Sequence, residues 1–577
     1  MLFRLVWRYL RNHIPAVLAI FVLQIIAVVA ALFLPDLNAR IVNEGVVVGD
    51  TDVIWRLGGI MVAFSVVQAV TAGAAIIIAA VTSMGLGRWL RREQFDHAQR
   101  FSTAQLSRIG PPSLITRNTN DVQQIQMVTM MTFTIVVTAP LMGIGAVFMA
   151  LRQSPQMSTL LLVVVPLIAL IVALVMVRMH PLFRTQQTRI DRMNTTLREQ
   201  LSGVRVIRAF VRQDTERQKY QNANADLRDV ALSIGKLFAF MFPATQFIIW
   251  MAQVAVIWFG GHLVEQGSME VGSLIAFINY LMQIFMSVMM AGFIFVMVPR
   301  GEVSAKRIVE VLNTKSDLVV TDNPRELSGP AEYGLQNVSV AYPGAREPVL
   351  QDLSISFPRG TITGVVGPTA SGKSTLVNIL PRLFDVSEGD VVLNGHSIKD
   401  YTLEDVRSRI SLVPQQAYLF SGTIASTVAG HFRDSKVDRD RVVWALKGAQ
   451  AWEFVSKLEE GIDSEVEAGG QNFSGGQKQR LAIARALYRE ADLYIFDDSL
   501  SALDAQTEQR LRDGLIDYVG SAAVIIVSQK TSSIIDADQI LVLGDGGMQG
   551  LGTHKELLDS CQLYREIVES QSGEVLQ

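Results

Sequence analysis

Six long apolar runs occupy the first half of this 577-residue chain, and they constrain its fold more than any other feature. Each run is long enough to cross a lipid bilayer as an α-helix. None contains Asp, Glu, Lys or Arg, which argues against an ion-coupled carrier because such carriers use charges within the membrane. The predicted spans cover residues 14–34, 57–82, 127–151, 159–177, 237–261 and 272–298.

The composition predicts a soluble part beside this membrane part. Hydrophobic residues make up 49% of the chain, and 577 residues exceed what a single core holds, so we expect at least two domains. The formal net charge of −3 gives no indication of nucleic-acid binding. The single cysteine, Cys561, excludes an intramolecular disulfide, and we interpret it as a packing residue. The first apolar run is longer than a signal-peptide core, so it is predicted to be a retained span.

Basic residues predict the orientation of the spans, because they concentrate on the cytoplasmic side of a membrane. Arg4, Arg8 and Arg11 place the N-terminus in the cytoplasm. The long segments after the second and fourth spans are rich in arginine, so they are predicted to be cytoplasmic as well. Six crossings then return the chain to the cytoplasm, where ATP is found.

These two cytoplasmic segments have helical patterning, so we expect them to extend the membrane helices inward. Near their tips, residues 113–117 (SLITR) and 208–210 (RAF) offer apolar side chains. Such residues either dock on another domain or form ordinary helical hairpin turns.

The sixth span is rich in methionine and phenylalanine, which suit adaptable binding surfaces. This pattern indicates either a wall that binds hydrophobic molecules or a stripe that faces lipid and neighbouring helices. The uncharged polar residues Gln246, Gln253, Asn279 and Gln283 either line a cavity or form hydrogen bonds between helices. The residues of the stripe are Phe277, Met282, Phe285, Met286, Met289, Met290, Phe293, Phe295 and Met297.

A phosphate-binding loop lies in the second half of the chain. Its pattern is G-x-x-x-x-G-K-[ST], in which backbone N–H groups cradle phosphates, the lysine reaches the β- and γ-phosphates and the hydroxyl of Ser374 binds Mg²⁺. An apolar strand is predicted before it at 361–366 and a helix after it at 376–380, so the helix N-terminus points at the anion. The loop consists of Gly367, Pro368, Thr369, Ala370, Ser371, Gly372, Lys373, Ser374 and Thr375.

Other parts of an ATP site follow in a fixed order within a predicted α/β domain. Tyr342 can stack on adenine, Gln415 can reach Mg²⁺ or water, and Asp497 ends an apolar strand in a way that suits Mg²⁺ binding. A second phosphate cradle is predicted at a helix start, where backbone N–H groups and a hydroxyl come together. That cradle consists of Phe473, Ser474, Gly475, Gly476 and Gln477.

This set of motifs resembles the ATP-binding cassette family, and specifically its exporter half-transporters. The resemblance implies an all-α membrane domain of six helices at 1–300, a linker at 301–330 and an α/β P-loop nucleotide-binding domain at 331–577. It also implies that ATP and Mg²⁺ are bound, that Asp504 belongs to the D-loop and that the cytoplasmic arms carry coupling helices. Residues 201–210 of the second arm are similar to the exporter pattern. In the family, the signature of one subunit (here residues 473–477) contacts the ATP bound by the other.

Three residues depart from the family pattern. Asp498 follows Asp497 where the family usually has glutamate, Gln529 replaces the switch-loop histidine, and Ala468 stands where glutamate often precedes the signature. The first two departures resemble the degenerate-site subunit of heterodimeric bacterial multidrug exporters. The catalytic positions of this chain are then Asp498, Gln529 and Gln415, and the Mg²⁺ ligands are Ser374, Gln415 and Asp497.

The resemblance therefore implies a subunit that exports hydrophobic or amphipathic compounds across a bacterial plasma membrane, with both termini cytoplasmic. Its partners would be a second half-transporter and the lipid bilayer, and no nucleic acid. The alternatives are a transporter of lipid, peptide or siderophore, since fold does not determine substrate, and a non-transporting regulator that uses ATP occupancy as a switch.

Overall fold

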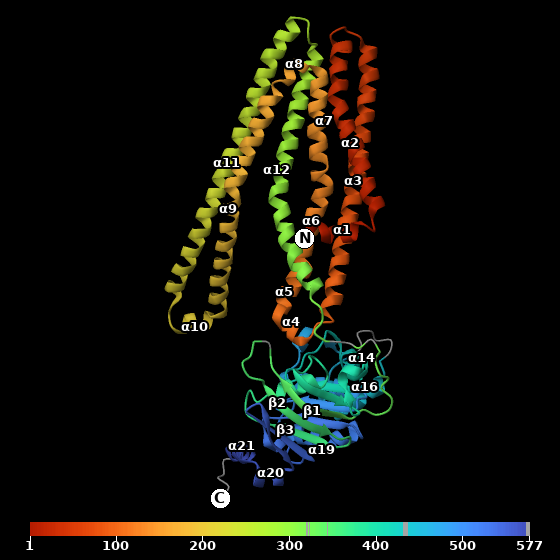
Figure 1. Cartoon of the computed structure of the whole chain (residues 1–577), viewed down its shortest axis with the longest axis vertical. Coiled ribbons are helices and arrows are strands. Elements are labelled where there is room, and N and C mark those ends of the chain that lie inside the picture. The colour runs from red at the N-terminus through yellow and green to blue at the C-terminus, as the bar shows by residue number, and fades with distance from the viewer. Residues whose placement is uncertain (319–320, 322, 343, 431–436, 573–577) are drawn as a thin grey trace. The chain divides into compact units, whose positions relative to one another are not determined.

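The computed structural model describes the chain except for residues 319–320, 322, 343, 431–436 and 573–577 (Figure 1). It also leaves the side chains at 180, 293–296 and 572 undescribed, so Phe293 and Phe295 of the sixth span lie outside the described side chains. The chain divides into two compact units. The first comprises residues 1–99 and 110–314, and the second comprises residues 100–109 and 315–577.

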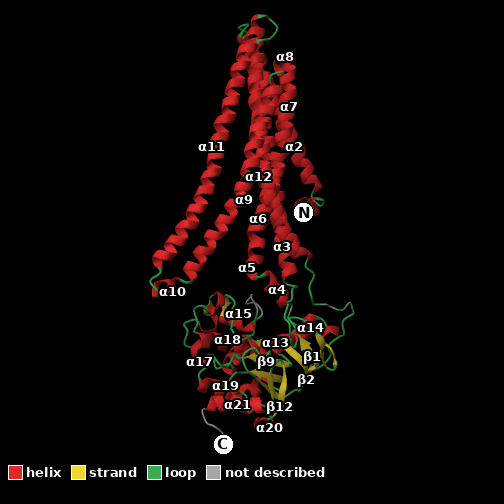
Figure 2. Ribbon diagram, turned by 60° about the vertical axis from the view of Figure 1, so that its left-hand side comes forward, coloured by secondary structure: helices red, strands yellow, loops and turns green. Residues whose placement is uncertain are grey.

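The first unit is built from long helices (Figures 1 and 2). Six of its helical stretches are long and apolar enough to span a membrane, as predicted: Ile14–Val46, Thr51–Ala98, Pro111–Gln153, Pro155–Ser202, Gln213–Glu265 and Val271–Asn313. Its elements are α1 (Leu2–Leu10), α2 (Ile14–Arg40), η1 (Ile41–Val46), α3 (Thr51–Ala98), α5 (Pro111–Thr116), η2 (Arg117–Asp121), α6 (Val122–Met131), η3 (Thr132–Val136), α7 (Thr138–Gln153), α8 (Pro155–Ser158), α9 (Leu161–Ser202), α10 (Val204–Ala209), α11 (Gln213–Glu265) and α12 (Val271–Asn313).

The helices of the first unit are far longer than a bilayer requires. A span needs about 20 residues, whereas α3 has 48 residues and α11 has 53. The helices α9 and α11 run side by side and are joined at their far end by the short helix α10 (Figure 1). These lengths confirm that the membrane helices continue well beyond the apolar runs, and the cytoplasmic location of the extensions stays a prediction.

Some residues of the methionine and phenylalanine stripe in the sixth span are buried in the core of the first unit, and others are exposed. Phe277 is fully buried among the helices, whereas Met286 has 58% of its surface exposed. Tyr280 is also buried, and its hydroxyl donates a hydrogen bond of 2.8 Å to the backbone carbonyl of Leu32, which ties α12 to α2. The stripe thus contains both helix-facing and outward-facing residues.

The second unit is organised by a six-stranded sheet of order β12-β11-β3-β10-β9-β6. Five of these strands are parallel and β12 is antiparallel. The strands of the unit are β1 (Tyr333–Val340), β2 (Leu350–Phe357), β3 (Ile362–Val366), β4 (Glu388–Leu393), β5 (His396–Ser397), β6 (Ile410–Val413), β7 (Gly422–Thr423), β8 (Glu465–Val466), β9 (Leu493–Asp497), β10 (Ala523–Val527), β11 (Gln539–Gly544) and β12 (Gly547–Gly552). A smaller antiparallel sheet has the order β2-β1-β4-β5, and β7 pairs with β8.

Helices surround these sheets. They are α4 (Thr103–Ile109), α13 (Lys373–Ile379), α14 (Leu403–Ser408), α15 (Ile424–Ala429), α16 (Arg439–Gly448), α17 (Trp452–Val455), α18 (Gly475–Tyr488), α19 (Ala505–Val519), α20 (His554–Ser560) and α21 (Gln562–Ser572), with short 3₁₀ turns η4 (Ile398–Asp400), η6 (Gly461–Asp463), η7 (Ala468–Gly470) and η8 (Thr531–Ser533). The fold is therefore an all-helical membrane unit followed by an α/β unit, as predicted.

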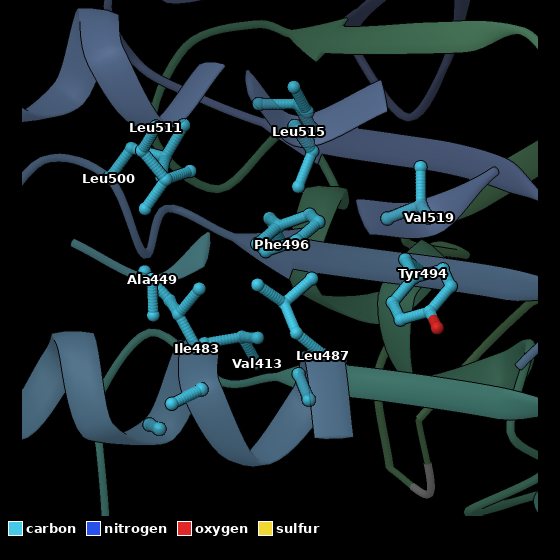
Figure 3. Close-up of a cluster of buried hydrophobic side chains, with 14 of the residues drawn as sticks. Val413, Ala449, Ile483, Leu487, Tyr494, Phe496, Leu500, Leu511, Leu515 and Val519 are labelled. Atoms are coloured by element: carbon cyan, nitrogen blue, oxygen red, sulfur yellow. The ribbon is translucent and has the colours of Figure 1, made fainter. Parts of the chain in front are cut away.

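The central strand β9 contributes to two hydrophobic cores, because successive side chains of a strand point to opposite faces. Tyr494 and Phe496 pack against α18 and α19, in the cluster shown in Figure 3. Leu493 and Ile495 belong to the cluster on the other face, which includes β1, β2 and α13. Burial on both faces fixes the register of the strand, because a slip of one residue would exchange the two sets of side chains.

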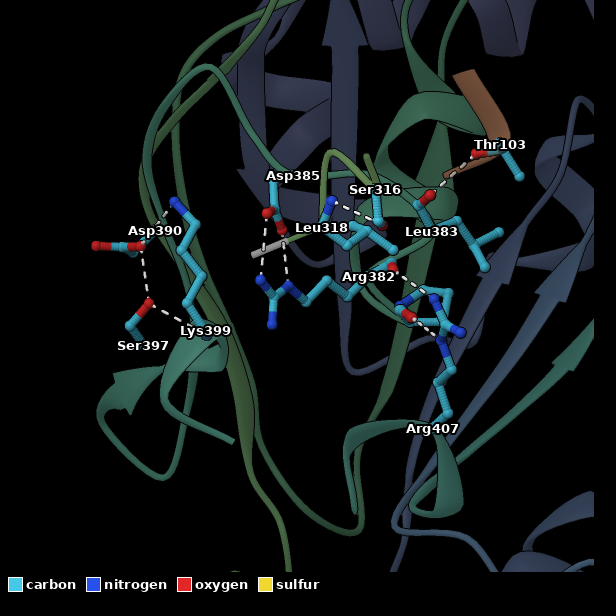
Figure 4. Close-up of polar contacts among 11 residues, drawn as sticks. Thr103, Ser316, Leu318, Arg382, Leu383, Asp385, Asp390, Ser397, Lys399 and Arg407 are labelled. Atoms are coloured by element: carbon cyan, nitrogen blue, oxygen red, sulfur yellow. Dashed lines mark hydrogen bonds and ion pairs between the residues drawn. The ribbon is translucent and has the colours of Figure 1, made fainter. Parts of the chain in front are cut away.

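A short segment of the first cytoplasmic arm is part of the second unit. The backbone N–H of Thr103 and its hydroxyl both donate hydrogen bonds, at 3.1 Å, to the carbonyl of Leu383 (Figure 4). Leu383 lies in a turn that is held by the ion pair between the buried Arg382 and Asp385, at 2.7 Å. The segment of the arm that packs within the second unit is therefore α4. Residues 113–117 lie in α5 and η2 of the first unit, and whether they dock on another domain or only form a hairpin turn stays a prediction.

One buried amide connects two segments of the second unit, residues 100–105 and 315–317, that begin where the chain leaves the first unit. The side chain of Gln105 is 4% exposed, and it donates a hydrogen bond of 2.7 Å to the carbonyl of Lys315. Its oxygen accepts hydrogen bonds from the N–H groups of Ser102 and Asp317. The hydroxyl of Ser316 adds a bond of 2.6 Å to the carbonyl of Arg100. The segments 100–105 and 315–317 are thus clipped together.

We expect Gln105→Leu to loosen this clip, because the substitution leaves backbone groups of Lys315, Asp317 and Ser102 without their partner. Each unsatisfied buried group costs about 1–3 kcal/mol. Hydrogen exchange of the backbone amides in 100–109 and 315–318 should accelerate in the full-length protein, while exchange in β9 stays unchanged. Ser107→Ala, at an exposed position of the same helix, is the matched control. Equal exchange in both variants would show that Gln105 does not hold the two segments together.

Candidate nucleotide-binding site

The candidate site lies where four parallel strands end. The loops that follow β3, β6, β9 and β10 carry the phosphate-binding loop, Gln415, Asp498 and Gln529, respectively. In an open α/β sheet, ligands bind outside the carboxyl ends of the strands. A cavity of about 400 Å³ occupies this edge. It is lined by Val349, Thr369, Ala370, Ser371, Gly372, Lys373, Ser374, Thr375, Gln415, Asp497, Asp498, Val527, Ser528 and Gln529.

The phosphate-binding loop adopts a conformation that favours glycine. Gly372 has φ 95° and precedes α13, and Ala370 has φ 69° although it carries a side chain. A Cβ at Gly367 would lie 2.2 Å from the carbonyl oxygen of Leu543, so only glycine fits there. The ammonium of Lys373 donates hydrogen bonds of 2.7 Å to the carbonyls of Gly367 and Pro368. The loop therefore curls around its own lysine, as a phosphate cradle requires.

The charges in the cavity perturb one another. Burial lowers the pKa of Lys373, and the carboxylates of Asp498 and Asp497 partly oppose this shift. Burial raises the pKa of Asp497 above its ordinary value, the charge of Asp498 raises it further, and Lys373 lowers it. A cation bound at this place would stabilise both carboxylates in their charged form.

The oxygen donors of the cavity fit Mg²⁺. Mg²⁺ is usually held by one or two carboxylates together with substrate phosphates and water, rather than by a cage of protein ligands. Asp497, Ser374 and Gln415 line the same cavity. Oδ1 of Asp498 is buried and has no hydrogen-bond partner among the described residues, which leaves an additional oxygen available. Among the described residues, no group of three or more His, Cys, Asp or Glu side chains is arranged to hold a metal ion.

Asp498 is engaged with Gln415. The side-chain amide of Gln415 donates a hydrogen bond of 3.1 Å to Oδ2 of Asp498. The backbone of Asp498 has φ 46°, and its N–H donates to the carbonyl of Val527 at 2.9 Å. This backbone conformation fixes the position of the Cβ atom of Asp498. The length of the side chain therefore determines how far the carboxylate extends from the backbone.

Gln529 reaches the cavity from the loop after β10. The N–H of Ser528 donates to the carbonyl of Val365 at 3.1 Å, which anchors the loop to β3. The carbonyl of Gln529 accepts a hydrogen bond of 2.7 Å from the side chain of Gln571 in α21. No sequence motif indicated Gln571, because it lies 42 residues from Gln529 and takes part through a single amide.

Tyr342 lies beside the phosphate-binding loop but does not line the cavity. Its hydroxyl is hydrogen-bonded to the hydroxyl of Thr375 at 3.2 Å. Its ring packs at an angle against Phe384, with 5.8 Å between the ring centroids, and it remains 40% exposed. The structure thus brings Tyr342 next to the loop, and the predicted stacking on adenine stays a prediction.

The second predicted cradle lies outside this cavity. Ser474 caps α18, with its hydroxyl accepting from the N–H of Gln477 while the side chain of Gln477 accepts from the N–H of Ser474. The helix begins at Gly475, directly after this capping residue, as the sequence predicted for residues 473–477. Ser474 and Gly475 are exposed. The described lining of the cavity includes neither Ser474 nor Gly475.

Asp504 and Ala468 also lie away from the cavity lining. Asp504 caps α19, and the hydrogen bond that its carboxylate accepts from the N–H of Thr507 lowers its pKa. Ala468 lies in the short turn η7 that leads to the signature. Neither position is therefore part of the lining of the chain's own phosphate cradle.

Comparison with known proteins identifies both units. Residues 17–288 match the ABC transporter transmembrane region, and residues 350–501 match the ABC transporter family. An uncharacterized ABC transporter ATP-binding protein of Mycobacterium tuberculosis is 43% identical over 577 residues, which cover 99% of this chain and 98% of the relative. An uncharacterized ABC transporter ATP-binding protein of Bacillus subtilis, YfiB, is 34% identical over 96% of each chain.

More distant relatives extend the similarity. The ATP-dependent lipid A-core flippase of Vibrio vulnificus is 26% identical over 99% of this chain and 98% of its own length. The structure of a bacterial Atm1-family ABC exporter with ATP bound has a TM-score of 0.78 and is 21% identical, covering 98% of this chain and 99% of the exporter. At that identity, the likeness to the exporter shows a shared fold.

The raised pKa of Asp497 predicts that Mg²⁺-dependent ATP binding weakens on mild acidification. A protonated carboxyl is a poor Mg²⁺ ligand, and burial moves the pKa of this group above the ordinary value of 3.8, so the loss should begin at higher pH than for an exposed aspartate. Titration of ATP binding with and without Mg²⁺ measures this effect.

Asp497→Asn should retain only the pH dependence of the nucleotide itself, and Asp513→Asn, at an exposed position of α19, should behave as the unsubstituted protein. A Mg²⁺-dependent affinity that stays constant down to the ordinary aspartate pKa would contradict the assignment of Asp497 as a ligand.

Proposed function

Because this chain belongs to the ATP-binding cassette transporter family, as an exporter with a membrane unit and an ATP-binding unit, we propose that it is one subunit of a heterodimeric exporter. Its own site binds ATP with Mg²⁺ and hydrolyses it slowly, and turnover occurs mainly at the site that it completes for its partner. The main support for slow hydrolysis is that Asp498 and Gln529, which both depart from the family pattern, line the cavity.

The binding half of the site supports ATP retention. Lys373 is positioned for the β- and γ-phosphates, and Ser374, Gln415 and Asp497 would hold Mg²⁺. Mg²⁺ held by these residues would supply positive charge that offsets the negative charge of the phosphates. None of these residue types departs from the family pattern, which supports intact phosphate and metal contacts.

The hydrolytic half supports slow turnover. Phosphoryl transfer depends chiefly on positioning the nucleophile and stabilising charge. The carboxylate of Asp498 is about 1.5 Å shorter in reach than that of glutamate, the length of one C–C bond, and a misplacement of about 1 Å costs on the order of 10²-fold in rate. The hydrogen bond from Gln415 to Oδ2 of Asp498 further engages this carboxylate.

Gln529 adds a second deficit. An amide side chain donates a hydrogen bond to a phosphate, but it does not titrate near neutral pH as histidine does. A site that combines Asp498 with Gln529 therefore holds ATP for long periods and clamps the two ATP-binding units together while the other site cycles.

The signature of this chain serves its partner in this account. The start of α18 at Ser474 is exposed and lies outside the lining of the chain's own cavity. Backbone N–H groups at a helix N-terminus bind anions. Ser474 and Gly475 would thus contact the γ-phosphate held by the partner. Asp504 would be the D-loop residue of this chain.

The transported molecules are hydrophobic or amphipathic in this proposal, and the subunit lies in a bacterial plasma membrane with both termini in the cytoplasm. The uncharged apolar spans and the arginine-rich N-terminus support this topology. Lipids are the second candidate substrate class, favoured by the similarity to lipid A-core flippases. An ATPase screen of the co-purified pair, with drugs and with lipids as stimulants, separates the two classes.

Substitutions at the two cradles should have unequal effects on the pair. Ser474→Arg removes the contact with the partner's ATP and should abolish most of the ATPase activity. Lys373→Ala weakens ATP binding at the chain's own slow site and should reduce turnover less. Steady-state ATPase rates of the co-expressed pair measure the ranking, and the reverse order would show that the two sites are assigned the wrong way round.

The substitutions Asp498→Glu and Gln529→His should together restore hydrolysis at this chain's site. The longer carboxylate regains about 1.5 Å of reach, and the imidazole supplies a titratable group. Hydrolysis is measured in a pair whose other site is inactivated. If ATP still binds while hydrolysis stays at background, the two residues do not set the asymmetry, and Ala468 becomes the next position to test.

A further inference from the structure

Two helices hold the loop that carries Gln529: α19, which precedes it in the chain, and α21, which follows it. From α19, the buried Glu508 accepts a hydrogen bond from the hydroxyl of Ser533, and the guanidinium of Arg512 donates to the carbonyl of Ser532. These contacts fix the far end of the loop, at η8. The near end, which enters the nucleotide cavity, is held from α21.

From α21, the side-chain amide of Gln571 makes three hydrogen bonds to the loop. The side-chain nitrogen of Gln571 donates a hydrogen bond of 2.7 Å to the carbonyl of Gln529. Its oxygen accepts one of 2.8 Å from the N–H of Thr531 and one of 3.0 Å from the hydroxyl of Thr531. The amide therefore bridges the peptides on both sides of Lys530 and restricts the backbone that places the Gln529 side chain.

The helix that carries Gln571 is itself anchored in the core. Tyr564 is fully buried, and its hydroxyl is hydrogen-bonded to Nδ1 of His554 at 2.8 Å. Leu563, Ile567 and Val568 pack against the hydrophobic cluster that includes β9 and β10. This apolar face fixes the position of α21 and therefore the position of Gln571 in its last turn. A shift of the helix would move the loop through the hydrogen bonds of Gln571.

We propose that Gln571 is a positioning residue that holds the Gln529 loop against the nucleotide, so that α21 sets how long this site retains ATP. The inference rests on the proposed function, in which this site is the one that holds ATP for long periods. Gln571 touches no reacting group, and it acts through its hydrogen bonds to the backbone of Gln529 and to the backbone and hydroxyl of Thr531.

The test measures release of nucleotide from the assembled full-length exporter. The probe is a fluorescent, non-hydrolysable ATP analogue with a methylanthraniloyl group on the ribose, and the part of the signal lost in Lys373→Ala is assigned to this chain's site. Gln571→Ala should speed release from this site about tenfold, the factor that corresponds to one net hydrogen bond. Gln562→Ala is the matched control, because among the described residues the Gln562 amide donates to Glu566 of the same helix and not to the loop.

A second variant separates the two roles of the Gln571 amide, as a hydrogen-bond donor to Gln529 and as an acceptor from Thr531. Gln571→Glu retains an acceptor for Thr531 but cannot donate to the carbonyl of Gln529, so its release rate should lie between those of the unsubstituted protein and Gln571→Ala. Hydrogen exchange in residues 528–533 should rise in the same order. These readouts separate positioning from general stability, which the thermal midpoints of Gln571→Ala and Gln562→Ala compare directly.

Two outcomes would overturn the inference. Exchange that rises in Gln571→Ala while release stays at the unsubstituted rate would show that the contact is structural only, and unchanged exchange would show that Gln571 does not hold the loop. Rapid hydrolysis of ATP by this chain's site would instead contradict the proposed function. The release measurement is independent of that result, because the analogue is not hydrolysed.

Discussion

The parallel pairing of β3, β10, β9 and β6 is the constraint on which the nucleotide site depends. Because parallel strands end at one edge, the loops that follow them meet there, although they are far apart in the sequence. The register is fixed by burial, since Tyr494 and Phe496 fill one core and Leu493 and Ile495 fill the other. Asp497 therefore ends its strand beside the phosphate-binding loop.

In the proposed function, ATP binding and ATP hydrolysis depend on different residues of this frame. The groups expected to bind phosphate and Mg²⁺ belong to the loop after β3 and to the end of β9, whereas Asp498 and Gln529 follow β9 and β10 and line the same cavity. The side chain of Gln415 contacts Asp498, and the side chain of Gln571 contacts the backbone of Gln529.

The sequence predicted the parts of the molecule that local patterns encode. Apolar runs indicated the six spans, and the motif around Lys373 indicated a strand, a loop and a helix that the structure contains. The packing of α4 within the second unit left no such local signal, because it depends on polar contacts of Thr103 and Gln105 with distant backbone groups. Gln571 escaped prediction for the same reason, because one amide bonded to distant backbone leaves no periodic or motif signal.

The most direct measurement of the central claim is the chemical state of the nucleotide bound to this subunit during turnover. Photoreactive ATP labelled on either the α- or the γ-phosphate can be crosslinked to the working exporter and assigned to each subunit. The account predicts that this subunit retains both labels in equal amounts, because its bound ATP stays intact. Retention of the α-label with loss of the γ-label on this subunit would contradict the account, because it would show that the site hydrolyses ATP in each cycle.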